Sequence, residues 1–92
     1  MHVPKDSRYT TIRIQVESNN LKNIADILDY IPASILAQDL PLKPTRLNKI
    51  FANPAQFTMH EMHLLAELID CDFKRIFHLL SDEVVRLKTA GQ

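Results

Sequence analysis

Prolines divide the middle of the chain into short segments. Four of its five prolines lie from residue 32 to residue 54 of the 92 residues. A proline has no N–H donor and disfavours the helical conformation in the residue before it, so Pro32 and Pro41 are expected to end helices. Pro44 instead suits the first position of a helix, where a missing N–H loses no helical partner. The segments between these prolines can therefore form only short helices.

Apolar residues at a spacing of three or four predict a series of helices connected by tight turns. We expect these helices at about residues 21–31, 33–40, 44–52 and 59–69, with a fifth from residue 73 onward. Helix is thus the expected element throughout the second half of the chain.

Capping residues sharpen several of these boundaries. Thr58 and Glu61 form the Thr-x-x-Glu pattern of a capping box, which starts the fourth helix at Met59. Asp72 can cap the fifth helix with its side chain. Asn53 is expected to take the left-handed conformation that often follows the last residue of a helix.

Residues 9–17, YTTIRIQVE, are compatible with either a strand or a helix. Ile12, Ile14 and Val16 alternate with polar residues, as in a half-buried strand. Tyr9, Ile12 and Val16 also lie at helical spacing, so both interpretations stay open. We expect residues 1–20 to form an N-terminal arm, 21–80 a helix-turn-helix domain and 81–92 a C-terminal helical extension.

Charge is balanced over the chain but uneven along it. The chain has eleven Lys and Arg and also eleven Asp and Glu, and this balance excludes a uniformly basic surface. No acidic residue occurs from residue 40 to residue 60, whereas Lys43, Arg46 and Lys49 lie in that window. A phosphate backbone would repel carboxylates, so this segment is compatible with nucleic acid binding.

Signals for catalysis, metal binding and membrane insertion are weak. His60 and His63 are three residues apart and miss the His-Glu-x-x-His spacing of metalloproteases by one residue. Cys71, the single cysteine, is expected to be a buried small apolar residue, and Gly91, the single glycine, cannot form a phosphate-binding loop. No apolar run approaches the ~20 residues of a membrane span. We expect a cytoplasmic protein that is not an enzyme, with no cofactor, metal, membrane partner or small-molecule ligand.

Apolar and small residues recur from about residue 21 to residue 77 at the spacing of a known family of DNA-binding domains. They are Leu36, Ala37, Leu42, Leu47, Ile50, Pro54, Leu65, Ala66, Ile69, Cys71 and Phe77. In this pattern the chain resembles the lambda repressor and Cro type of helix-turn-helix protein. The resemblance implies an all-α, five-helix domain whose helix at about residues 44–52 enters the DNA major groove.

The resemblance also implies which residues would contact DNA. By position they are Lys43, Pro44, Thr45, Arg46, Asn48 and Lys49. Lys49 or Arg46 could donate to guanine and Asn48 could pair with adenine, while lysines that miss a base would contact phosphates.

The expected function is sequence-specific regulation of transcription by a homodimer on double-stranded DNA. The dimer would use the C-terminal helix, with Val84 and Leu87 exposed in a monomer, and residues 9–17 could pair across the two-fold axis. The alternative is a protein–protein interaction module, adaptor-like or antitoxin-like, that keeps the helix-turn-helix fold without binding DNA.

Overall fold

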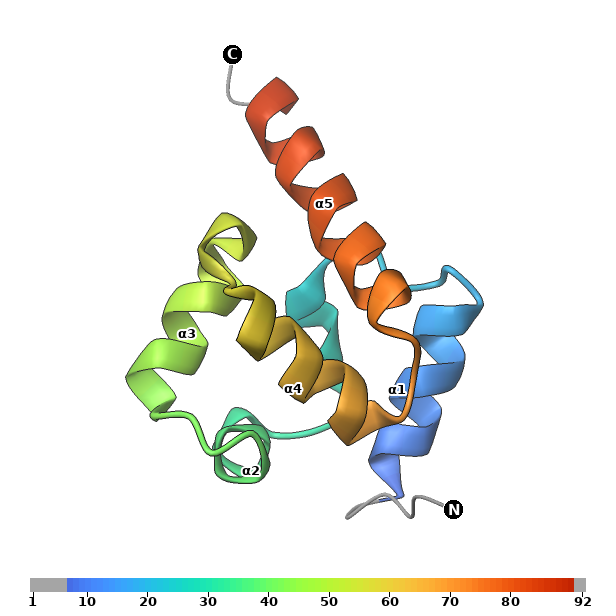
Figure 1. Ribbon diagram of the computed structural model, residues 1–92, viewed down its shortest axis with the longest axis vertical. Coiled ribbons are helices and arrows are strands. Elements are labelled where there is room, and N and C mark those ends of the chain that lie inside the picture. Colours follow the sequence, from blue (N-terminus) through green and yellow to red (C-terminus); the bar gives the residue numbers. More distant parts are fainter. Residues whose placement is uncertain (1–6, 91–92) are drawn as a thin grey trace.

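The computed structural model describes residues 7–90, and this part of the chain is helical without a strand. The expected all-α fold is confirmed. Figure 1 shows α4 in the middle of the molecule, with α3 on one side of it and α1 on the other. The elements are α1 (Arg8–Glu17), η1 (Ile24–Asp29), α2 (Ala33–Asp39), α3 (Pro44–Ala52), η2 (Pro54–Gln56), α4 (Met59–Ile69) and α5 (Phe73–Ala90), where η denotes a 3₁₀ helix.

Residues 9–17 form most of helix α1, so the strand interpretation is wrong. Tyr9, Ile12 and Val16 are buried in the core, which is the pattern of helical spacing and not of alternation. The Tyr9 hydroxyl also donates to Asp39 Oδ2 at 2.7 Å and thereby connects α1 to α2. Helix α1 is therefore packed into the domain, whereas residues 1–6 of the expected arm lie outside the described residues.

The helix expected at 21–31 is shorter and tighter than its apolar pattern suggests. Only Ile24–Asp29 are helical, and they form a 3₁₀ helix. The Asp26 carboxylate accepts from the Asn23 N–H at 3.2 Å, and Glu83 Oε1 of α5 accepts from the Ile24 N–H at 2.7 Å. These side-chain bonds satisfy the first backbone donors of the turn, and such local bonds compete with a longer α-helix.

Helices α2 and α3 are joined by a turn at residues 40–43. The Leu42 N–H donates to the carbonyl of Ala37 at 2.9 Å, which closes the end of α2. Pro41 has a φ of 23°. This value lies far from the range near about −65° that its ring favours, so the turn contains local backbone strain. As expected, α2 and α3 occupy nearly the predicted ranges.

The capping box at the start of α4 is confirmed. Thr58 Oγ1 accepts from the Glu61 N–H at 3.1 Å, and Glu61 Oε1 accepts from the Thr58 N–H at 2.9 Å. Asp72 likewise caps α5, because its Oδ1 accepts from the Lys74 N–H at 2.9 Å. The left-handed conformation expected of Asn53 is wrong: its φ is −136° and its ψ is 89°. Pro54 follows it, and a residue before proline is displaced toward extended conformations.

Replacing Thr58 by alanine is expected to lower the free energy of unfolding by about 1 kcal/mol, because the Glu61 N–H loses its acceptor. Urea denaturation followed by circular dichroism measures this change. Thr45→Ala is the matched control, since Thr45 is exposed and its side chain bonds to no other residue within 7–90. Equal losses in the two variants would contradict a capping role for Thr58.

Helix α5 is continuous from Phe73 to Ala90 and extends beyond the rest of the molecule (Figure 1). The predicted boundary between residues 80 and 81 therefore falls within an unbroken helix, and residues 91–92 lie outside the described part. Val85 and Leu87 are 60% and 51% exposed, whereas Val84 is half-buried. No helix within the described residues is both long and apolar enough to cross a membrane.

Candidate nucleic-acid interface

Helix α3 has one side in the core and one side in solvent. Leu47, Ile50 and Phe51 are buried, with exposed fractions of 5% or less. Because these three anchors fix the rotation of the helix, Thr45, Asn48 and Lys49 are directed toward solvent. Figure 1 shows α3 at the edge of the molecule, where a partner can approach it.

Five of the six predicted contact residues are on the exposed side or at the start of α3. They are Lys43, Pro44, Thr45, Asn48 and Lys49. Within residues 7–90, the four of these that carry polar side chains bond to no other side chain or backbone group. Their donors and acceptors are therefore available to a partner.

Arg46, the sixth predicted contact residue, is engaged inside the protein. Its Nε donates to Glu61 Oε2 at 2.8 Å and its Nη2 to Glu61 Oε1 at 2.8 Å. Nη2 also donates to the carbonyl of Gln56 at 2.9 Å. When the parallel N–H donors of a guanidinium are paired with a carboxylate, they cannot bind a guanine at the same time. The structure therefore makes Arg46 a positioning residue that connects α3 to η2 and α4.

The carboxylate of Glu61 is strongly stabilised in its charged form. The hydrogen bond from Arg46, with smaller contributions from the bonds with Thr58 and against the opposing effect of burial, lowers the pKa of Glu61 to about 2. The same hydrogen bond raises the pKa of Arg46. Both groups are consequently ionised at neutral pH.

This ion pair changes the charge of the candidate interface. The window without acidic residues in the sequence has a carboxylate beside it in space, because Glu61 contacts Arg46. Of the three cations in the window, only Lys43 and Lys49 keep an uncompensated charge, since neither forms an ion pair within residues 7–90. The segment is thus less basic than its sequence indicates.

The two exposed cations and the two neutral polar residues can form different kinds of contact with DNA. Asn48 can form two hydrogen bonds with one adenine, and Thr45 can bond a base edge or contact a thymine methyl group. Lys49 can donate to guanine, whereas Lys43 precedes the helix in an extended conformation and is suited to a phosphate. Pro44, the first helical residue, offers only an apolar contact.

The contact between Arg46 and Glu61 is not evident from the sequence, because the two residues lie 15 positions apart. One signal was present: Arg46 is four residues before Ile50, which places it beside the buried side of a helix. An ionised residue at such a position requires a partner, and the capping-box glutamate is the nearest carboxylate that follows it in the chain.

The other candidate groups from the sequence are the histidines of α4 and Cys71. The described residues contain no cluster of three or more His, Cys, Asp or Glu that could hold a metal ion. His63 is exposed and its ring stacks on Phe73 with centroids 4.0 Å apart. Cys71 is half-buried and not fully buried as expected. Burial raises the pKa of its thiol to about 12, with smaller contributions from Glu17 and neighbouring carboxylates, which disfavours the nucleophilic thiolate.

Comparison of the chain with protein-family models, curated proteins and solved structures gave no match.

Proposed function

We propose that the protein binds double-stranded DNA with α3 in the major groove and acts as a sequence-specific regulator of transcription. The observation that carries this proposal is the outer side of α3, where exposed polar side chains have no partner among residues 7–90 while the opposite side is anchored in the core. A helix presented in this way after a short turn is the arrangement of helix-turn-helix proteins. The resemblance to the lambda repressor and Cro type supports the same conclusion.

In this proposal, the residues of α3 have separate roles. Thr45, Asn48 and Lys49 contact base edges, and Lys43 contacts the phosphate backbone. Arg46 does not contact DNA but holds α3 against Glu61. Sequence preference therefore depends on three side chains, each contributing about 1 to 3 kcal/mol of discrimination for a good base contact.

The proposed regulator is a homodimer in the cytoplasm, where a single cysteine stays reduced. Two copies would place their α3 helices on half-sites about one helical turn of DNA apart. The exposed Val85 and Leu87 near the end of α5 support a contact through this helix. Pairing of residues 9–17 as strands across the two-fold axis is excluded, because these residues form α1 and three of them are buried in the core.

An interaction module without DNA binding is the second candidate. Its specific support is the neutralisation of Arg46 by Glu61, in a chain whose Lys and Arg are already balanced by Asp and Glu. Such a module would use the outer side of α3 to bind a protein. DNA binding and its dependence on salt distinguish the two functions.

We expect fluorescence anisotropy to show binding of labelled genomic DNA fragments that weakens at least tenfold when salt rises from about 50 to about 200 mM. Asn48→Ala combined with Lys49→Ala should weaken binding at least tenfold, with loss of sequence preference, because base contacts are removed. Arg46 is left unchanged, because its replacement would also disturb the position of α3.

Lys74→Ala is the control for a general loss of positive charge. Lys74 is exposed in the first turn of α5, and α5 begins on the side of the molecule away from α3 (Figure 1). Its replacement should leave DNA binding nearly unchanged. If the folded protein fails to bind at the lower salt concentration, the interaction module becomes the better account. Equal effects of the Asn48→Ala, Lys49→Ala double variant and of Lys74→Ala would contradict the assignment of the interface to α3.

A further inference from the structure

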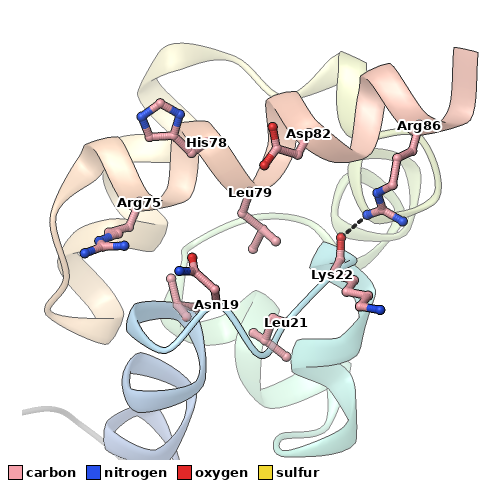
Figure 2. Close-up of a pocket in the computed structure, with 9 residues that line it drawn as sticks. Asn19, Leu21, Lys22, Arg75, His78, Leu79, Asp82 and Arg86 are labelled. Carbon is pink, nitrogen blue, oxygen red and sulfur yellow. Dashed lines mark hydrogen bonds between the residues drawn. The ribbon is translucent and has the colours of Figure 1, made fainter.

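A second candidate site lies between helix α5 and the segment that follows α1. Figure 2 shows a pocket here, with a volume of about 600 Å³, into which Leu79 of α5 points toward Asn19 and Leu21. Pockets for small molecules typically have volumes of about 300 to 1,000 Å³. The sequence alone predicts no ligand here, because residues 16–22 and 75–86 are far apart in the chain and only the fold brings them together.

The lining of this pocket is positively charged although the whole chain is neutral. Lys22, Arg75 and Arg86 line it, and among the described residues Asp82 is the one carboxylate that opposes them. Such a concentration of one charge sign in a concave surface attracts ligands of the opposite charge. The pocket therefore favours an anion.

Arg86 is fixed at one end of the pocket. Its Nη2 donates to the carbonyl oxygen of Lys22, the contact drawn in Figure 2, and to Asn23 Oδ1 at 3.2 Å. These bonds tie the end of α5 to the segment before η1. Because the Arg86 side chain is already held in place, ligand binding would not require the entropic cost of ordering this wall of the pocket.

Arg75 and His78 provide the open donors at the other end. They are three residues apart on α5, and in Figure 2 their side chains extend in different directions from the helix. Within the described part of the chain, neither has a hydrogen-bond or ion-pair partner. A guanidinium fork binds carboxylate and phosphate oxygens with two parallel hydrogen bonds. Arg75 is thus the position at which an oxyanion would be held.

Apolar side chains form the part of the pocket next to these donors. Val16, Leu21 and Leu79 line it, and Val16 and Leu21 are buried while Leu79 is partly buried against the core. Leu79 keeps part of its side chain exposed, so an apolar group placed on it would remove further apolar surface from water. The ligand that fits both features has an oxyanion at one end and a compact apolar body.

We propose that this pocket binds a small organic anion, with its phosphate or carboxylate group on Arg75 and its apolar body on Leu79. The site is separate from the outer side of α3, which lies on the other side of α4 (Figure 1). The proposal therefore does not depend on DNA binding by α3.

Titration of the ¹⁵N-labelled protein with phenyl phosphate, benzoate and inorganic phosphate tests this proposal. Saturable shifts of backbone amides in residues 19–22 and 75–86 are expected with phenyl phosphate or benzoate, and weaker effects with inorganic phosphate, which lacks the apolar body. Comparison of the first two probes shows which oxyanion the site prefers.

Variants assign the binding to named groups. Arg75→Gln should weaken binding about tenfold by removing the charged fork. Asp82→Asn should strengthen binding, because it removes a carboxylate that lines the pocket and would repel an anion. Lys88→Gln is the control for lost positive charge, since Lys88 is exposed on the same helix but does not line the pocket.

Three results would overturn the proposal. They are the absence of saturable shifts with all three probes at millimolar concentration, equal effects of Arg75→Gln and Lys88→Gln, and weaker binding to Asp82→Asn. Preserved amide dispersion in each variant shows that the fold is intact, so a loss of binding is then assigned to the pocket.

Discussion

Replacing Leu47 by alanine is expected to lower the free energy of unfolding by about 2 to 5 kcal/mol. Leu47 is 1% exposed and lies on the inner side of α3, so its truncation removes apolar contacts and leaves a cavity. Small domains are stable by only about 5 to 15 kcal/mol, so this loss is a large fraction of the total. Guanidinium denaturation followed by circular dichroism measures it as a lower midpoint.

Met59→Ala is the control for side-chain truncation at an exposed site. Met59 is the first residue of α4 and is 56% exposed, so its replacement should change the free energy of unfolding by less than about 0.5 kcal/mol. A similar small change for both variants would show that α3 is not anchored through Leu47. The outer side of the helix would then lack the fixed orientation on which the proposed DNA contact depends.

Replacing Glu61 by glutamine is expected to destabilise the protein by about 1 to 2 kcal/mol at neutral pH, because Arg46 loses its charged partner. The loss is limited to this range because Arg46 is partly exposed and water screens the pair. The pKa of Glu61 is about 2 in the folded protein and 4.5 without such interactions. A lowered pKa means that the stabilisation is complete above pH 4.5 and is lost as the pH falls from 4.5 toward 2. The variant should lack this part of the pH dependence.

Glu67→Gln is the matched control for this pH dependence. Glu67 is on the same helix but is exposed, and its carboxylate bonds to no group within residues 7–90. Its replacement should leave both the stability at neutral pH and the acid profile close to those of the original chain. Denaturation at several pH values gives the profiles. Identical profiles for the two variants would contradict the role of the Arg46–Glu61 pair.

The elements that were predictable from sequence are those whose signals are local. Helix α4 begins and ends at the expected residues, because the Thr58–Glu61 capping box and its apolar spacing act within one turn. The segment at 21–31 was predicted as an α-helix from equally regular apolar spacing. Its actual 3₁₀ form is stabilised by Glu83, which is 59 residues from Ile24 in sequence. The spacing of apolar residues cannot predict contacts between residues so far apart in the sequence.

In the candidate interface, too, the features that depend on local sequence signals were predictable and those that depend on distant contacts were not. Exposure of Asn48 and Lys49 was predictable, because the spacing of Leu47, Ile50 and Phe51 fixes the buried side of α3. The role of Arg46 was not predictable, since a charged residue beside the apolar stripe can either extend into solvent or find a partner from another element. The fold determines which of the two occurs.

The bonds of Glu61 also affect how this protein could change over evolutionary time or be redesigned. Glu61 binds Arg46 with both oxygens and the backbone of Thr58 with one of them, so the orientation of α3 depends on residues that are not among those proposed to contact bases. Thr45, Asn48 and Lys49 have no such structural bonds in residues 7–90. They can consequently be replaced by other polar residues at little thermodynamic cost. The exposed residues of α3 can therefore be substituted while the position of this helix in the domain is retained.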